Sequence, residues 1–137
     1  RGEQIEELAV EPDLTLILIQ PPFGLATPKV YSLWQPQGEE STEGLDSLLL
    51  ALRNSDGKAL GQLMHNDLER PAFQLAPELS VVKSGLSQAG LPCLLSGSGA
   101  CLFAVVPNSN GPAINWLHKV RQQLPSHYRA SLVRTRF

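Results

Sequence analysis

The first clear hydrophobic pattern in the chain is a short run of branched apolar residues. Residues 13–20 have the sequence Asp-Leu-Thr-Leu-Ile-Leu-Ile-Gln, and prolines at 12, 21 and 22 lie on either side of the run. A short apolar run between such breakers is typical of a buried strand. We therefore expect a central strand of a sheet here. The acidic segment at 5–10 has apolar residues without regular spacing and is a candidate edge strand.

Three helical patterns follow in the middle of the chain. Leucines at 45, 48, 49 and 52 have the i, i+3, i+4, i+7 spacing of an amphipathic helix that ends near Asn54. A second helix is predicted from a cap at 55–56 to the interruption at Asn66-Asp67. A third helix should begin at Pro77 and end at Gly90, which are residue types favoured at those two boundaries.

Two segments before these helices are predicted to lack regular structure. Prolines and a glycine between 21 and 28 should exclude helix and strand until about residue 29, which makes 23–27 a shaped loop at the end of a strand. Residues 35–43 are almost entirely polar and are expected to form a poorly ordered surface connection.

The second half of the chain predicts two strands, a helix and a last strand. The strands at 92–95 and 101–106 are separated by the glycine-rich segment 96–100, the helix runs from Pro112 to Pro125, and the last strand covers 130–135. This order of elements predicts an α+β fold of the ferredoxin-like, split βαβ type, with an antiparallel sheet, helices on one face and extra helices in the first crossover.

Composition and charge narrow the class of protein. The chain has 137 residues and a mass of 14.9 kDa, which predicts one domain over 1–137. Its formal net charge is −2, without a basic run, so we expect no nucleic-acid partner. No apolar run approaches the roughly 20 residues that span a bilayer, so we expect no membrane span.

The cysteines, histidines and tryptophans suggest no metal site or disulfide framework. Two cysteines, Cys93 and Cys101, flank the 96–100 segment; they could meet across a hairpin, although small buried packing residues are the commoner use. They favour a reducing compartment, either cytosol or plastid stroma. The three histidines have no metal-ligand spacing, and Trp34 and Trp116 are predicted to be packing residues.

The first residue, Arg1, is followed by no charged and then apolar leader. We therefore expect this chain to begin inside a longer protein or after a processing point.

The segment Ser96-Gly97-Ser98-Gly99-Ala100 is the most informative candidate for chemistry. Its glycines can expose backbone N–H groups that hold a phosphate, whereas a plain glycine-serine hairpin turn is the structural alternative. A P-loop is excluded, because no Lys-Ser or Lys-Thr follows the last glycine.

Two other segments carry polar or aromatic candidates. Thr27 offers a hydroxyl, and Tyr31 offers a ring that could stack on a base or pack in the core or at its rim. Asn66, Asp67 and Glu69 could supply carboxylates, but Asn and Asp at helix ends usually bond the local backbone, and we favour that role.

Taken together and in order, three blocks resemble the C-terminal domain of the 4-diphosphocytidyl-2-C-methyl-D-erythritol kinase family, within the GHMP kinase superfamily. They are Arg1-Gly2-Glu3, then Thr27-Pro28-Lys29-Val30-Tyr31, and then Asn66-Asp67-Leu68-Glu69 with Leu95-Ser96-Gly97-Ser98-Gly99-Ala100-Cys101 one helix later. Singly each block is weak, but their order and spacing cover nearly the whole chain.

The resemblance implies a kinase that passes the γ-phosphate of ATP to a hydroxyl of a CDP-linked methylerythritol, in the non-mevalonate route to isoprenoids (terpenoids). It implies that Tyr31 stacks on the cytosine ring, that Thr27 and Pro28 lie near the substrate, and that Ser96, Gly97, Ser98, Gly99 and Ala100 lie close to the phosphate-transfer site. ATP and Mg²⁺ belong to the full-length enzyme. The family's nucleotide loop and its catalytic Lys and Asp belong to an N-terminal domain, and this chain contains none of them.

We therefore expect the chain to be the substrate-side half of such a kinase, with its own N-terminal domain as partner. On this hypothesis the 137 residues hold no catalytic residue, no metal and no cofactor, and are inactive alone. One alternative is a stand-alone, non-catalytic ligand-binding or interaction module that shares the ferredoxin-like fold. Another is a GHMP kinase with a different small alcohol substrate.

Overall fold

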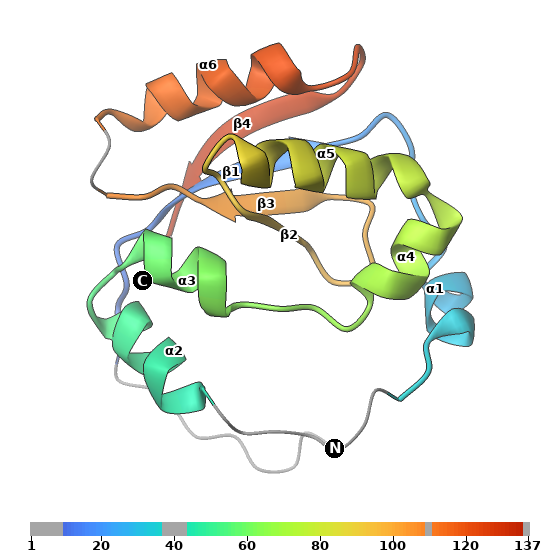
Figure 1. Cartoon of the computed structure of the whole chain (residues 1–137), viewed down its shortest axis with the longest axis horizontal. Helices are drawn as coiled ribbons and strands as arrows, with labels where there is room; N and C mark the ends of the chain where they lie inside the picture. The colour runs from blue at the N-terminus through green and yellow to red at the C-terminus, as the bar shows by residue number, and fades with distance from the viewer. Residues whose placement is uncertain (1–9, 37–43, 109–110, 136–137) are drawn as a thin grey trace.

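The structure of the protein is a computed structural model that describes residues 10–36, 44–108 and 111–135. Four strands and six helices follow one another along these residues (Figure 1). In chain order they are β1 (Thr15–Gln20), α1 (Thr27–Leu33), α2 (Leu45–Arg53), α3 (Gly57–Leu63), α4 (Glu69–Leu75), α5 (Pro77–Gln88), β2 (Cys93–Leu95), β3 (Leu102–Val105), α6 (Ala113–Gln123) and β4 (Arg129–Arg134).

The four strands form one antiparallel sheet in the order β2-β3-β1-β4. The first predicted strand, β1, is central, with Ile17 opposite Ala104 of β3 on one side and opposite Leu132 of β4 on the other. This order is that of a ferredoxin-like split βαβ domain, so the predicted α+β class and antiparallel sheet are confirmed.

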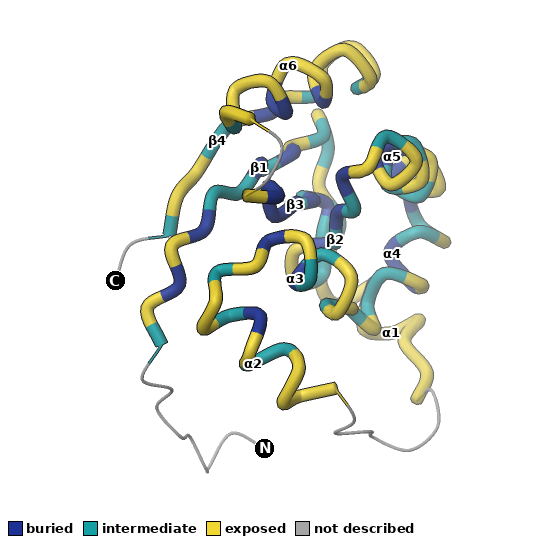
Figure 2. Tube along the Cα trace, turned by 60° about the vertical axis from the view of Figure 1, so that its left-hand side comes forward, coloured by how far each residue is buried: buried dark blue, intermediate teal, exposed yellow. Residues whose placement is uncertain are grey.

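One face of the sheet carries the larger core. Side chains alternate between the two faces of a strand, so Ile17 and Ile19 of β1 share this face with Leu102 and Ala104 of β3. Helices α5 and α6 cover it, as Figure 2 shows, and contribute buried residues such as Leu79, Leu86, Trp116, Leu117 and Val120. Burial of Trp116 confirms its predicted packing role.

The opposite face is covered at one end by the helix pair α2 and α3. Leu14 and Val105 form a second, smaller core with Ala51 of α2 and Leu60 of α3. These are the extra helices predicted in the first crossover. The prediction that the helices share one face of the sheet is wrong for this pair, because α2 and α3 lie on the other side of the sheet from α5 and α6 (Figure 2).

Two short helices were not predicted. Helix α1 occupies 27–33, where prolines were expected to prevent regular structure until about 29; Pro28 lies in its first turn, where a missing N–H costs nothing. Helix α4 occupies 69–75, immediately after the predicted interruption at 66–67, and Pro71 likewise lies near its start. The predicted edge strand at 5–10 and the predicted connection at 35–43 fall almost entirely outside the described residues.

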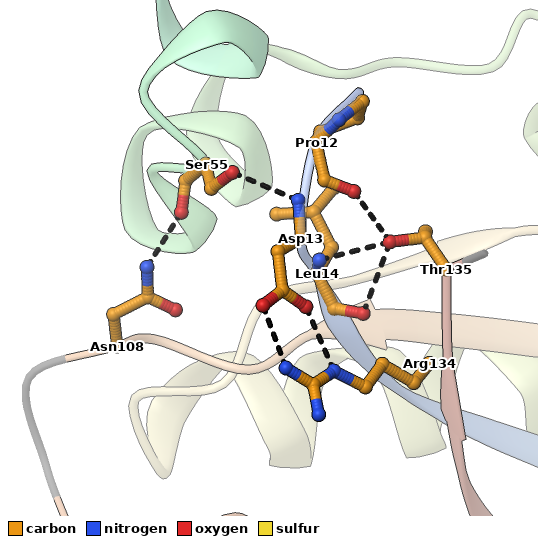
Figure 3. Close-up of polar contacts among 7 residues, drawn as sticks. All are labelled: Pro12, Asp13, Leu14, Ser55, Asn108, Arg134 and Thr135. Atoms are coloured by element: carbon orange, nitrogen blue, oxygen red, sulfur yellow. Dashed lines mark hydrogen bonds and ion pairs between the residues drawn. The ribbon is translucent and has the colours of Figure 1, made fainter. Parts of the chain in front are cut away.

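A polar cluster joins three parts of the fold around the start of β1 (Figure 3). The carboxylate of Asp13 accepts two hydrogen bonds from the guanidinium of Arg134, at 2.8 and 2.6 Å. Ser55, in the turn between α2 and α3, accepts from the Asp13 N–H at 3.0 Å, and its carbonyl accepts from the Asn108 side chain at 2.6 Å. The bond to Arg134 holds the pKa of Asp13 below its usual value. This cluster fastens the α2–α3 turn to the sheet.

Candidate functional site

The structure brings together the two segments that the sequence singled out separately. Thr27 begins α1, and Ser98 lies in the loop between β2 and β3, 71 positions later in the chain. Their hydroxyl oxygens, Thr27 Oγ1 and Ser98 Oγ, are 2.8 Å apart and share a hydrogen bond. The candidate site therefore consists of the start of α1 and the 96–100 loop.

The 96–100 loop is a tight turn with free backbone donors. It is closed by hydrogen bonds from Ser96 N–H to the carbonyl of Cys101 at 2.9 Å and from Gly99 N–H to the carbonyl of Ser96 at 3.0 Å. Within the described part of the chain, the N–H groups of Gly97 and Ser98 donate to no acceptor. The segment is thus a hairpin turn, as the structural alternative predicted, and it still presents two amides that an anion could use.

Apolar contacts fix the loop that leads into α1. A Cβ built on Gly99 would lie 3.0 Å from Leu95 Cδ1 and 3.1 Å from Leu25 Cδ1, so both leucines pack directly against this glycine. The ring of Phe23 packs edge-on against Tyr128, with centroids 6.4 Å apart. These contacts hold the 21–26 segment in place and thereby set the position of Thr27.

Tyr31 lies on the outside of α1, with 57% of its surface exposed. The buried residue of this helix is Val30, so the core role considered for Tyr31 is wrong and its ring is open to solvent. Trp34, which was predicted to be a packing residue, is also exposed. It lines a pocket of about 270 Å³ with Arg70 at the start of α4. The exposed end of α1 therefore carries two aromatic rings.

Side chains of the 66–69 segment form hydrogen bonds with the local backbone, as predicted. They also form hydrogen bonds with the backbone of residues 95–97, which was not predicted. Asn66 Oδ1 accepts from the Leu68 N–H at 2.9 Å, which is the expected local bond. Its Nδ2 donates to the carbonyls of Leu95 at 2.9 Å and Gly97 at 2.8 Å. Glu69 Oε1 accepts from the Leu95 N–H at 2.9 Å, and Oε2 pairs with Lys83 Nζ at 2.5 Å.

The alternative that Asp67 and Glu69 act as a carboxylate pair finds no support in this geometry. The carboxylate of Glu69 is occupied by the Leu95 N–H and Lys83, whereas Asp67 is exposed, with His65 Nε2 4.0 Å from its Oδ1. The long reach of Asn66 and Glu69 to the glycine loop had no signal in the sequence spacing, because it joins residues 26 to 31 positions apart.

The cysteines do not meet across the hairpin. Cys93 of β2 lies opposite Ala104, and Cys101 lies opposite Ser96, at the other end of the strand pair. Cys93 is buried, and this burial raises the pKa of its thiol to about 12, so it is a packing residue as predicted. In residues 10–36, 44–108 and 111–135, no three His, Cys, Asp or Glu side chains are grouped to hold a metal ion, and none of the helices is long and apolar enough to cross a membrane.

Comparison with known proteins identifies relatives of this domain. The family model described as GHMP kinases C terminal matches residues 48–126. A 4-diphosphocytidyl-2-C-methyl-D-erythritol kinase from Pelotomaculum thermopropionicum is 32% identical over 106 residues, which cover 77% of this chain and 37% of that protein. The kinase of the same name from Shouchella clausii is 34% identical over 110 residues, covering 77% of this chain and 36% of that protein.

Two solved structures are similar to this chain. The crystal structure of a 4-(cytidine 5′-diphospho)-2C-methyl-D-erythritol kinase matches with a TM-score of 0.67 and 29% identity, over 96% of this chain and 46% of that one. Homoserine kinase from Cytophaga hutchinsonii matches with a TM-score of 0.71 at 19% identity, over 97% of this chain and 44% of that one, and supports the fold alone.

These matches confirm the resemblance predicted from the three sequence blocks. The chain spans little more than a third of the length of the curated relatives it matches. Its sheet order and its family match agree: the chain belongs to the GHMP kinase C-terminal family.

Proposed function

We propose that this chain is the substrate-side half of a 4-diphosphocytidyl-2-C-methyl-D-erythritol kinase. The whole enzyme would transfer the γ-phosphate of ATP to a hydroxyl of the CDP-linked methylerythritol, in non-mevalonate isoprenoid biosynthesis. The observation that carries the proposal is the 2.8 Å hydrogen bond between Thr27 and Ser98. It joins the two segments to which the family resemblance assigns the cytosine contact and the phosphate-transfer loop.

Tyr31 is the residue proposed to stack on the cytosine ring. Its side chain is exposed, on the same short helix that begins at Thr27. A ring in such a position can cover one face of a base, and stacking of this kind contributes about 1–3 kcal/mol. Thr27 and Pro28 would line the substrate next to it.

The 96–100 loop is proposed to lie against the phosphate being transferred. Phosphoryl transfer needs mostly positioning and stabilisation of charge, which fixed N–H donors provide. The N–H groups of Gly97 and Ser98 are the available donors, with the hydroxyl of Ser98 beside them, hydrogen-bonded to Thr27. The role of this chain would be to hold the substrate in place.

The remaining chemistry is assigned to a domain outside this chain. In the family, the ATP loop and the catalytic Lys and Asp belong to the N-terminal domain, and Mg²⁺ would accompany ATP there. Residues 1–137 would then form a single domain whose partners are that domain and the CDP-linked substrate. The compartment would be bacterial cytoplasm or plastid stroma.

The first experiment measures the product of the native gene. An antibody raised against this chain detects the protein in its native cell, and its denatured mass is determined. We expect a mass at least double 14.9 kDa. We also expect the purified product to phosphorylate the CDP-linked substrate with ATP. A native product of 14.9 kDa would instead favour a stand-alone binding module and would reject the proposal.

The second experiment tests the substrate class through Tyr31. In the full-length enzyme, Tyr31→Ala should raise the KM for the CDP-linked substrate by about 5- to 150-fold, the equivalent of 1–3 kcal/mol of stacking. Tyr31→Phe keeps the ring and should leave KM nearly unchanged. Val81→Ala, at an exposed position on α5, is the matched control for removal of a surface apolar group. Unchanged kcat and KM in Tyr31→Ala would point to a GHMP kinase for a different alcohol.

A further inference from the structure

We propose that Asn66 and Glu69 are positioning residues that set the direction of the free Ser98 N–H in the 96–100 loop. Neither residue belongs to the segments proposed to contact the substrate. Asn66 lies just before α4, and Glu69 is the first residue of that helix. This inference rests on the proposed function, since it assigns a role to that same loop.

Asn66 binds two backbone carbonyls, one on each side of Ser96. Its Nδ2 donates to Leu95 O at 2.9 Å and to Gly97 O at 2.8 Å, so one amide group holds the chain on both sides of Ser96. The Gly97 carbonyl and the Ser98 N–H belong to the same planar peptide unit, and that unit is trans. In a trans peptide the two groups point in opposite directions. By holding the Gly97 carbonyl, Asn66 therefore fixes the Ser98 N–H in the direction away from the Asn66 side chain.

Glu69 fixes the strand end from which the loop departs. Its Oε1 accepts from the Leu95 N–H at 2.9 Å, and the ammonium of Lys83 on α5 compensates its charge. The side chain of Glu69 is 16% exposed, so this carboxylate is shielded and its two partners are correspondingly important. Together, Asn66 and Glu69 hold both the N–H and the carbonyl of Leu95.

Packing around Gly97 does not replace these bonds. A Cβ built on Gly97 would meet no atom within 4 Å, and its φ of +56° is a conformation that glycine adopts without strain. No apolar contact of a side chain at 97 restrains this peptide. The hydrogen bond from Asn66 acts directly on the Gly97 carbonyl, whereas the Gly99–Ser96 and Thr27–Ser98 bonds hold the neighbouring residues.

Hydrogen exchange tests the proposal without any measurement of activity. In the full-length protein, Asn66→Asp keeps the oxygen that accepts from Leu68 but removes both bonds to the loop and turns a carboxylate oxygen toward two carbonyls. We expect exchange in the peptide that covers 96–101 to rise about tenfold, while exchange in α6 stays the same. Asp67→Asn, at a neighbouring exposed position, is the control. It should alter exchange neither in 96–101 nor in α6. Unchanged exchange in 96–101 would overturn the proposal.

Kinetics of the same full-length variants separate positioning from a loss of folding. Asn66→Asp should lower kcat by about 10- to 100-fold per folded molecule, as for a misplaced phosphate-contacting loop, with the KM for the CDP-linked substrate within threefold of the wild type. Glu69→Ala should have a similar effect, and Glu69→Gln, which keeps an acceptor for the Leu95 N–H, should recover most of kcat. A kcat that falls only in proportion to the folded fraction would reject the positioning role.

The two proposals fail in different ways. If the wild-type full-length protein phosphorylates no CDP-linked substrate, the proposed function is wrong, and the exchange experiment still decides whether Asn66 controls the loop. If the wild type is active but Asn66→Asp alters neither exchange nor kcat, only the positioning proposal fails.

Discussion

Gly97 and Gly99 differ in what surrounds them, although both have a positive φ. Gly97, at +56°, has open space on its side-chain side, whereas Gly99, at +93°, faces Leu95 and Leu25. The glycine at 99 is therefore required both by the backbone conformation and by the close approach of the segment that leads into α1. The glycine at 97 is required by the backbone alone.

Replacement by alanine should separate these two requirements. Gly97→Ala should cost about 1–2 kcal/mol of unfolding free energy, the usual strain of a left-handed residue. Gly99→Ala should cost at least about 1 kcal/mol more, because its Cβ also displaces the two leucines by a few tenths of an ångström. Urea titration of both variants measures the difference. Equal losses would show that Leu25 moves away freely and does not fix the segment before Thr27.

The two thiols should differ in reactivity in the native state. Burial holds the pKa of Cys93 at about 12, and the thiolate is the reactive form. At pH 8 an alkylating reagent should therefore modify Cys101, which is partly exposed, and leave Cys93 intact until the protein unfolds. Mass spectrometry of the peptides containing each cysteine measures both rates. Modification of Cys93 at the rate of Cys101 in the folded protein would contradict its buried position.

The same raised pKa has a defined effect on stability. The folded pKa of Cys93 lies above the value in the unfolded chain, so the folded state retains the proton longer. Its contribution is complete below the unfolded pKa, near 9, and is lost as the pH rises from there toward 12. Cys93→Ala should make the alkaline part of the stability curve flatter, and an unchanged slope would contradict the assignment.

Most elements of the fold could be predicted from the sequence, because their patterns are local. The apolar run of β1 and the leucine spacing of α2 each indicate, within a few residues, which side chains are buried. Helices α1 and α4 were missed because each is short and contains a proline, which weakens the helical signal. Helix α3 is equally short but has a side-chain cap and no proline, and it was predicted. Thr27, Tyr31 and the 96–100 loop were predicted as site residues from motifs. Their proximity, and the reach of Asn66 to the loop, depend on tertiary packing that no local pattern encodes.

The packing of α3 on the sheet depends on a glycine at its first residue. A Cβ on Gly57 would overlap the carbonyl oxygen of Val106, just after β3, and approach Val105 Cγ1 at 3.0 Å. Because the clash is with backbone, α3 would have to move away from the strand. A Cβ built on Gly85, inside α5, would meet no atom within 4 Å. Gly85 therefore provides a matched comparison.

Alanine at these two helical positions should change stability in opposite directions. Gly57→Ala should destabilise the fold by about 1–3 kcal/mol, the usual cost of overpacking. Gly85→Ala should stabilise it by about 0.5–1 kcal/mol, because alanine is the better helix former. Denaturant unfolding of both variants measures the two changes in unfolding free energy. A stabilising Gly57→Ala would show that α3 can shift on the sheet without cost, and would weaken the assignment of a second core beneath it.

At the scale of the whole molecule, this chain presents a site with one side only. The residues proposed to contact substrate come from α1 and the β2–β3 loop, and the aromatic rings of Tyr31 and Trp34 are exposed rather than covered. Phosphoryl transfer requires the ATP phosphates, a cation and the acceptor hydroxyl to be held in one geometry. On the proposed function these further groups belong to an N-terminal domain, and a complete site would then require both domains.

The 137 residues alone should therefore show no ATP-dependent phosphorylation of the CDP-linked substrate, whereas the full-length protein should. The comparison uses equal molar amounts, and circular dichroism of the isolated chain verifies that its helices and strands are formed. Transfer of labelled γ-phosphate from ATP is the measurement. Phosphorylated product from the folded isolated chain would contradict the expectation, because it would require an ATP site within the 137 residues themselves. Absence of product from both proteins would reject the proposed substrate instead.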